Sequence, residues 1–367
     1  MKLDSINPIL KNDLEHIFNS LNTMQKNAFK DSTILMTGAA GFLGFEMLHF
    51  FSFYANTLGI KKIIALDNFM LRQPQWLQNL KNVEIYKFDI IKDKLDSINN
   101  AKEANFIIHA ASIASPSFYR SYPIETLDAN IWGLRALLDF YVDKGIKGFL
   151  FFSSSEIYGD PDSKFIPTSE EYRGNVACIG PRACYDESKR FGETMCYLYA
   201  QKYNMPLTIV RPFNNYGLGM NLQDKRVPAD FANACVTKSD INILSDGSPK
   251  RTFCYIADAI SGYIKALSYG RFDYFNIGID TPEISILELA HIYAKNAEKI
   301  LNFKPKINFA KSSDKNYLVD NPNRRCPIIK KAKTLLDYNP QILVEQGVSR
   351  FLEYLKLDSI ESKGGEK

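Results

Sequence analysis

Thr33-Ile-Leu-Met-Thr-Gly-Ala-Ala-Gly-Phe-Leu-Gly44 decides the fold, because an apolar run, three spaced glycines and the start of a helical pattern follow one another without a gap. Gly38 permits a tight turn after a strand, Gly41 lets the backbone approach a ligand, and Gly44 lets a helix pack closely on its strand. The free N–H groups at the start of such a helix favour phosphate. The stretch predicts a dinucleotide-binding turn, although similar glycines also occur in ordinary turns.

Strand-like apolar runs alternate with helical patterns along most of the chain. The runs lie at 33–37, 63–67, 83–88, 105–110, 148–154 and 207–213, and a short strand follows at 274–277. Strands that alternate with helices form a parallel sheet with helices on both faces. The sequence therefore predicts an α/β fold with a Rossmann-like, doubly wound parallel sheet.

The rest of the chain predicts a division into four parts. Leu10, Leu14, Ile17, Phe18 and Leu21 fall at helical spacing and predict an N-terminal helical extension that packs on the body or on a second subunit. Turn-rich sequence after Pro212 predicts a smaller lobe. We expect an extension at 1–31, a dinucleotide-binding domain at 32–213 plus 252–280, a C-terminal substrate-binding lobe at 214–251 plus 281–357, and a mobile tail at 358–367.

Composition excludes several other classes of protein. The net charge of +4, from 45 basic and 41 acidic residues, is too balanced to indicate a nucleic-acid partner. The six cysteines and four histidines show no metal-ligand spacing. No apolar run approaches the roughly 20 residues of a membrane span, and no leader pattern is evident. We expect a reduced, cytoplasmic protein without a metal or a membrane partner.

In an open parallel sheet, ligands gather beyond the carboxyl ends of the strands. Small or polar residues end six of the predicted strands: Gly38, Asp67, Asp89, His109-Ala-Ala-Ser112, Ser153-Ser-Ser155 and Arg211. A carboxylate at Asp67 suits the ribose hydroxyl groups of adenosine and would repel the additional phosphate of NADP. The expected cofactor is therefore NAD.

A second group of residues indicates proton transfer. Tyr185 and Lys189 lie four residues apart and share one face of a predicted helix. Such a pair is common and usually structural, but here it follows the serine-rich strand end in a chain with a dinucleotide turn. An ammonium group and an oxidised nicotinamide would both favour the phenolate form of Tyr185. Tyr185 could then take a proton from a substrate alcohol that Ser154 holds by a hydrogen bond.

Five motifs follow one another along the chain: Thr37-Gly-Ala-Ala-Gly-Phe-Leu-Gly44, His109-Ala-Ala-Ser112, Ser153-Ser-Ser-Glu-Ile-Tyr-Gly159, Tyr185-Asp-Glu-Ser-Lys-Arg190 and Arg211-Pro-Phe-Asn-Asn-Tyr-Gly217. In this order, from about Ser32 to Tyr354, the chain resembles extended short-chain dehydrogenases of the nucleotide-sugar epimerase/dehydratase/decarboxylase family. The resemblance implies a tightly bound NAD that is reduced and reoxidised in one turnover, and a nucleoside-diphosphate sugar substrate, with a UDP-sugar favoured. It also implies a homodimer formed through the helices around 125–144 and 185–203.

The resemblance assigns roles to individual residues. The implied cofactor-binding residues are Gly38, Gly41, Phe42, Leu43, Gly44, Asp67, Asn68, Asp89, Ile90, Ala110, Ala111, Ser112, Asn130, Tyr185 and Lys189. The implied substrate-binding residues are Ser115, Tyr119, Arg120, Asn214, Arg226, Arg251 and Arg325. For the arginines the alternative is a surface ion pair.

The residues after Ser154 bear on the reaction. Dehydratases of the family carry Thr-Asp-Glu, whereas this chain carries Ser154-Ser155-Glu156. Together with Cys184-Tyr-Asp-Glu-Ser-Lys-Arg-Phe-Gly-Glu-Thr-Met-Cys196, this looks most like the UDP-glucuronic acid decarboxylases (UDP-xylose synthases), lyases of carbohydrate biosynthesis. In these enzymes a C4 ketone makes the C6 carboxylate a β-keto acid that loses carbon dioxide. The catalytic residues implied are Ser154, Ser155, Glu156, Tyr185, Lys189 and Arg325.

Three alternatives remain open. The run Phe213-Asn-Asn-Tyr-Gly217 is equally typical of dehydratases, so a 4,6-dehydratase or a 4-epimerase of another nucleotide hexose also fits. A non-catalytic NAD-binding scaffold could use the same fold, although the intact Ser154, Tyr185 and Lys189 argue against it. Arg120 has no counterpart in the motif and could contact a carboxylate or another substrate group.

Overall fold

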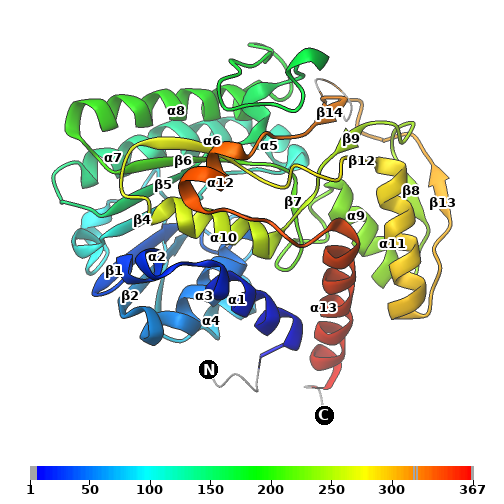
Figure 1. Cartoon of the computed structure of the whole chain (residues 1–367), viewed down its shortest axis with the longest axis horizontal. Helices are drawn as coiled ribbons and strands as arrows, with labels where there is room; N and C mark the ends of the chain where they lie inside the picture. The colour runs from blue at the N-terminus through cyan, green and yellow to red at the C-terminus, as the bar shows by residue number, and fades with distance from the viewer. Residues whose placement is uncertain (1–5, 317–318, 320, 365–367) are drawn as a thin grey trace.

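A seven-stranded parallel sheet forms the centre of the protein in a computed structural model that describes residues 6–316, 319 and 321–364 (Figure 1). Its strands are β1 (Ser32–Thr37), β2 (Ile60–Asp67), β3 (Val83–Lys87), β4 (Phe106–His109), β5 (Gly148–Phe152), β6 (Leu207–Pro212) and β11 (Asp273–Ile277). They lie in the order β11-β6-β5-β4-β1-β2-β3, and every neighbouring pair is parallel. The predicted Rossmann-like, doubly wound sheet is confirmed. The strand order reverses between β1 and β4, where such a sheet opens a ligand crevice.

Helices cover both faces of this sheet because successive strand residues point to opposite sides. In β1, Ile34 and Met36 join one apolar core, whereas Leu35 joins the other. The first core packs against α1 (Pro8–Ser20), α3 (Phe42–Leu58) and α10 (Ile256–Leu267). The second packs against α7 (Leu134–Tyr141) and α8 (Ala183–Tyr203), which lie across the sheet from α3 and α10 (Figure 1).

The helix predicted at 125–144 consists of three consecutive pieces. They are α6 (Pro123–Asp128), the π-helical turn η4 (Ala129–Gly133) and α7. Gly145, four residues after α7, has a φ of +60°, a left-handed conformation that favours glycine. The remaining short elements of this half are α2 (Thr23–Ala28), α4 (Gln75–Gln78), α5 (Pro116–Ser121), η2 (Leu95–Ser97), η3 (Ala101–Glu103), η5 (Ser155–Tyr158) and η6 (Ser163–Phe165).

The C-terminal part adds short strands and long helices beside the sheet (Figure 1). Its elements are β7 (Asn215–Tyr216), α9 (Val227–Val236), β8 (Ile241–Ile243), β9 (Lys250–Arg251), β10 (Cys254–Tyr255), β12 (Ile284–Ser285), α11 (Ile286–Leu301), β13 (Ile307–Phe309), β14 (Arg324–Arg325), α12 (Lys330–Leu336) and α13 (Val344–Gly364). The strand β13 pairs with β8, and β9 lies between β12 and β14. The division into domains stays a prediction. Residues 358–364 of the predicted tail continue α13, and residues 365–367 lie outside the described residues.

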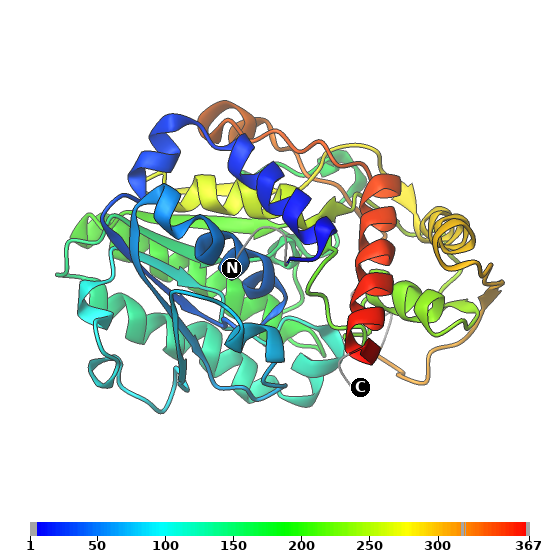
Figure 2. The same cartoon turned by 90° about the horizontal axis from the view of Figure 1, so that it is seen from below.

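The N-terminal helix α1 packs on the body of the protein, one of the two placements that its apolar stripe allowed. Leu10, Leu14 and Ile17 are buried in the same core as α3 and α10. Asp13 is also fully buried, where it pairs with Arg350 of α13 at 2.6 Å. The two ends of the chain therefore lie side by side, as Figure 2 shows for α1 and α13.

The helices and the cysteines were also compared with the expectations from the sequence. None of the helices in the described part of the chain combines the length and apolar character that crossing a bilayer requires. All six cysteines have free thiols. Four of them, Cys196, Cys235, Cys254 and Cys326, are buried.

Candidate active site

A cavity of about 1310 Å³ runs from the glycine turn, along the carboxyl ends of the strands, to the C-terminal elements. It is lined by nearly all of the residues that the sequence predicted for the site. Among the residues with an implied binding or catalytic role, Gly44 and Asn130 are the two exceptions. The strand-end residues His109 and Arg211 do not line the cavity either. Gly44 lies inside α3, where a Cβ atom would come within 2.1 Å of Ala39 O. Asn130 is buried in η4 and donates to Ser188 Oγ at 2.9 Å.

The end of the cavity at β1 and β2 fits a dinucleotide. A Cβ atom on Gly38 would lie 2.5 Å from the backbone of Ala111, so only glycine fits this turn. Gly41 caps α3 without a side-chain hydrogen bond, which leaves the first N–H groups of the helix open to phosphate. Asp67 ends β2 and accepts hydrogen bonds from Ala40 N at 2.9 Å and Phe69 N at 2.8 Å. These bonds fix the carboxylate in the cavity wall, where it would meet ribose hydroxyl groups.

Ser154, Tyr185 and Lys189 meet in the middle of the cavity. Ser154 follows β5, and the other two come from the first turns of α8. Burial raises the pKa of Tyr185 to about 12, although a hydrogen bond with Ser154 opposes the rise. Burial lowers the pKa of Lys189 to about 7, and its Nζ donates to Phe152 O at 2.7 Å. The Lys189 Nζ lies 5.7 Å from the centre of the Tyr185 ring, close enough to favour a phenolate when the amine is charged.

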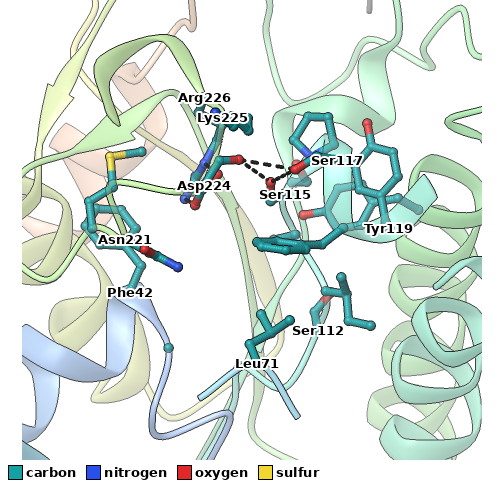
Figure 3. Close-up of a pocket in the computed structure, with 18 of the residues that line it drawn as sticks. Phe42, Leu71, Ser112, Ser115, Ser117, Tyr119, Asn221, Asp224, Lys225 and Arg226 are labelled. Atoms are coloured by element: carbon teal, nitrogen blue, oxygen red, sulfur yellow. Dashed lines mark hydrogen bonds and ion pairs between the residues drawn. The ribbon is translucent and has the colours of Figure 1, made fainter. Parts of the chain in front are cut away.

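Aromatic and hydroxyl side chains from the segment around α5 form one wall of the cavity (Figure 3). The ring of Tyr119 stacks on that of Tyr185, with centroids 5.2 Å apart. Ser115 Oγ donates to Asp224 O at 2.6 Å, which joins this wall to the segment before α9. Figure 3 shows Ser115 and Tyr119 on the opposite side of the cavity from Phe42. The fixed ring of Tyr119 thus holds Tyr185 in place.

Glu156 forms ion pairs with two arginines in the wall of the cavity. Arg325 binds both of its carboxylate oxygens, with Nη1–Oε1 and Nη2–Oε2 distances of 2.5 and 2.6 Å. Arg182 donates a further hydrogen bond to Oε2. Burial alone would raise the pKa of Glu156, but the two guanidinium groups outweigh it and lower the pKa to about 2. Glu156 is therefore ionised at neutral pH and unable to donate a proton.

Arg182 was missed from the sequence. It lies three residues before Tyr185, at the start of α8, so helical spacing places it near Tyr185. Nothing in the run Gly180-Pro181-Arg182 distinguishes it from a surface arginine. Its partner Glu156 is 26 residues away in the chain, and only the fold brings the two together.

The other predicted arginines have different surroundings. Arg251 is buried and donates to three backbone carbonyls, those of Lys250, Pro322 and Asn323. Burial and the nearby Arg325 lower the pKa of Arg251 to about 9. These contacts exclude the surface ion pair for Arg251, and the Glu156 contact excludes it for Arg325.

Arg226 and Arg120 each form an ion pair at the cavity wall. Arg226 binds Asp224 through Nε at 2.8 Å and Nη2 at 2.5 Å. Arg120 pairs with Asp314, which lies between β13 and β14. The remaining predicted side chain, Asn214, donates to Thr252 O at 2.9 Å and has a φ of +45°. The guanidinium of Arg226 also lies 5.5 Å from the centre of the Phe42 ring, next to the glycine turn.

Comparison with known proteins agrees with this geometry. The model of the NAD dependent epimerase/dehydratase family matches residues 34–278, well over half of the chain. UDP-glucuronic acid decarboxylase 1 from Xenopus tropicalis is 31% identical over 327 residues, which are 88% of this chain and 72% of that protein.

Solved structures show the same fold. The UDP-glucose 4-epimerase of Thermotoga maritima, with UDP-glucose, superposes with a TM-score of 0.77 at 23% identity and covers 89% of this chain and 99% of its own. The UDP-glucuronic acid 4-epimerase of Bacillus cereus, in complex with UDP-glucuronic acid and NAD, has a TM-score of 0.73 at 24% identity, with coverage of 89% and 99%.

Proposed function

The chain belongs to the NAD-dependent epimerase/dehydratase family, and we propose that it is a decarboxylase of a UDP-linked uronic acid, converting UDP-glucuronate to UDP-xylose or the related 4-keto pentose. The observation that carries the proposal is the pair of guanidinium groups, Arg182 and Arg325, on an ionised Glu156 in the wall of the cavity. An arginine pair beside the catalytic tyrosine suits a sugar that carries a carboxylate.

Individual residues would have separate roles in the proposed reaction. Tyr185 would take the proton of the sugar C4 hydroxyl, which Ser154 would hold by a hydrogen bond. Lys189 would stabilise the phenolate, since its ammonium lies near the Tyr185 ring. Bound NAD would supply the acceptor and donor of the hydride at C4. Arg325 and Arg182 would hold the carboxylate end of the sugar. Arg226 and Arg251, which also line the cavity, would bind the diphosphate.

The ionised state of Glu156 favours loss of carbon dioxide over loss of water. Dehydration needs an acid that protonates the departing C6 hydroxyl, and the dehydratases of the family carry an aspartate for this task at the position of Ser155. A serine hydroxyl is no acid at neutral pH, and Glu156 keeps no proton, because its pKa is about 2. Loss of carbon dioxide from a β-keto carboxylate needs no such donor. The enolate that remains would then take up a proton at C5, before hydride returns to C4.

The test is incubation of the purified protein with NAD and UDP-glucuronate. We expect release of carbon dioxide and a nucleotide product smaller by its mass, detected by mass spectrometry. Absence of both would overturn the proposal. A screen of nucleotide hexoses separates the alternatives, since a 4,6-dehydratase gives a product that has lost water and a 4-epimerase gives an isomer. A protein that binds NAD and turns over none of these substrates would be the non-catalytic scaffold.

We propose further that the protein works as a homodimer in the cytoplasm. Large apolar side chains are exposed on the outer side of η4, α6 and α8, among them Ile124, Trp132, Phe191 and Leu198. These helices lie together on one face of the sheet (Figure 1). Contiguous apolar surface of this kind is typical of subunit interfaces. Light scattering should give twice the mass of the chain, and Trp132→Asp should give a monomer. Imaging of a tagged chain tests the location.

A further inference from the structure

Arg182 lies between two carboxylates, of which one lines the cavity and the other does not. Its Nη2 donates to Glu156, which lines the cavity. On its other side, Arg182 Nε lies 3.5 Å from Asp186 Oδ2, one turn further along α8. Asp186 is buried and does not line the cavity. Neither Asp186 Oδ1 nor Arg182 Nε has a hydrogen-bond partner, so this second contact is an incomplete ion pair behind the wall of the site.

Asp186 faces charged or titratable groups from four elements. They are Arg182, Cys184 and Tyr185 at the start of α8, Glu156 on η5, Arg325 on β14 and Tyr119 on α5. Burial raises the pKa of Asp186 to about 7, the charge of Glu156 adds to the rise, and the two arginines oppose it. Because the pKa of Glu156 is about 2, Asp186 is the carboxylate of this cluster whose charge changes near neutral pH.

We propose that Asp186 is a positioning residue that couples binding of the substrate carboxylate at Arg182 and Arg325 to uptake of one proton from solvent. The inference rests on the proposed function, because it needs a sugar that carries a carboxylate. A second carboxylate beside the arginine pair makes an ionised Asp186 unfavourable, since like charges at short range disfavour each other. Protonation of Asp186 leaves the cluster of Arg182, Arg325 and Glu156 with one net positive charge, which the carboxylate of the ligand can balance. No bond of the substrate changes in this step.

The coupling predicts how binding depends on pH. The affinity for UDP-glucuronate should fall as pH rises above 7, by at most about tenfold per pH unit, because binding then requires a proton that the free enzyme lacks. The affinity for UDP-glucose, which has the same nucleotide and no carboxylate, should not change in this way. A merely structural Asp186 would affect both ligands equally.

The test is isothermal titration calorimetry of the NAD-bound Tyr185→Phe protein, a background that stops turnover, at pH 8 in two buffers of different ionisation enthalpy. The difference in heat between the buffers counts the protons taken up. We expect about half to one proton for UDP-glucuronate and close to none for UDP-glucose. Asp186→Asn, added to this background, should abolish the uptake. Glu187→Gln is the matched control, because Glu187 is the next residue of α8 and pairs with Arg190 on the outside of the helix.

Each outcome decides the question. Equal uptake for the two ligands, or uptake that persists with Asp186→Asn, would overturn the inference even if the parent protein proves to be a decarboxylase. If Asp186→Asn does not fold, the comparison of UDP-glucuronate with UDP-glucose in the parent still decides. Uptake that depends on Asp186, in a protein that releases no carbon dioxide, would support the inference and overturn the proposed reaction. A protein that does not bind UDP-glucuronate would overturn both.

Discussion

Replacement of Glu156 by glutamine should destabilise the folded protein by about 3 kcal/mol at neutral pH, because it leaves two buried guanidinium groups without their shared counter-charge. The side chains of Arg182 and Arg325 are only 7% and 8% exposed. Removal of one partner from a buried ion pair costs about 3 to 5 kcal/mol. The fall in the pKa of Glu156 from its ordinary 4.5 to about 2 gives a similar figure, at about 1.4 kcal/mol per unit.

The pH dependence follows from the direction of the pKa change. A carboxylate whose pKa is lower in the folded state contributes its full stabilisation above its ordinary pKa, and this contribution is lost as pH falls through the folded pKa. Loss of the Glu156 charge also lowers the pKa of Asp186, which changes the difference in unfolding free energy between the parent and Glu156→Gln as pH rises toward 7. The part of this difference that comes from the titration of Glu156 itself should be constant from pH 8 to about 5. It should shrink as pH falls from about 4.5 toward 2.

Urea unfolding at several pH values measures this difference. Glu283→Gln is the control, because Glu283 pairs with Arg324 at 2.6 Å at a site where the arginine is 40% exposed, and such pairs contribute about 0 to 1 kcal/mol. A Glu156→Gln loss no larger than that of the control, or one that does not change below pH 4.5, would refute the reasoning that two buried arginines hold Glu156 ionised.

Three other changes probe the rest of the site and the core. Tyr185→Phe should lower kcat by on the order of 10³-fold while NAD stays bound, which assays of turnover and of cofactor content would measure. The control Tyr197→Phe, on the exposed side of α8, should retain activity. Glu46 is fully buried, neither of its carboxylate oxygens is hydrogen-bonded, and burial raises its pKa. Ionisation of Glu46 therefore lowers the stability of the folded protein as pH rises above about 4.5. Urea unfolding should show that Glu46→Gln becomes more stable relative to the parent between pH 5 and pH 8, by about 1 kcal/mol or more. Arg120→Met should break the ion pair with Asp314 and raise KM for the nucleotide sugar with less than about 1 kcal/mol of lost stability; unchanged KM in steady-state kinetics would make the pair purely structural.

The fold was predictable because its signals are local. A short, largely apolar run in the sequence predicted each strand of the central sheet. The turn at Gly38 could be predicted from neighbours within a few residues. The topology then determines where the site lies, since parallel strands bring their carboxyl ends to one edge of the sheet. Ser154 and Tyr185 could be expected together for this reason, without knowledge of any long-range contact.

The charge cluster was not predictable in the same way. Glu156 and Arg325 are 169 residues apart, and the family resemblance placed each in the site without showing that they bind each other. Arg182 and Asp186 gave no signal at all, because a charged residue on a helix next to a catalytic motif is ordinarily solvated. Whether such a residue faces water or a partner depends on which other segment covers it, and local sequence does not contain that information.

The N-terminal helix shows the same limit in the core. Its apolar stripe predicted burial, but Asp13 is buried with it, and the sequence held no reason for this. The reason lies in distant segments: Tyr255 of β10 donates to Asp13 at 2.6 Å, and Arg350 of α13 pairs with it. The strand β10 pairs in turn with β7, and Asn215 of β7 lines the cavity. Although α1 precedes the part of the chain that the family model matches, it therefore supports the wall of the site from behind.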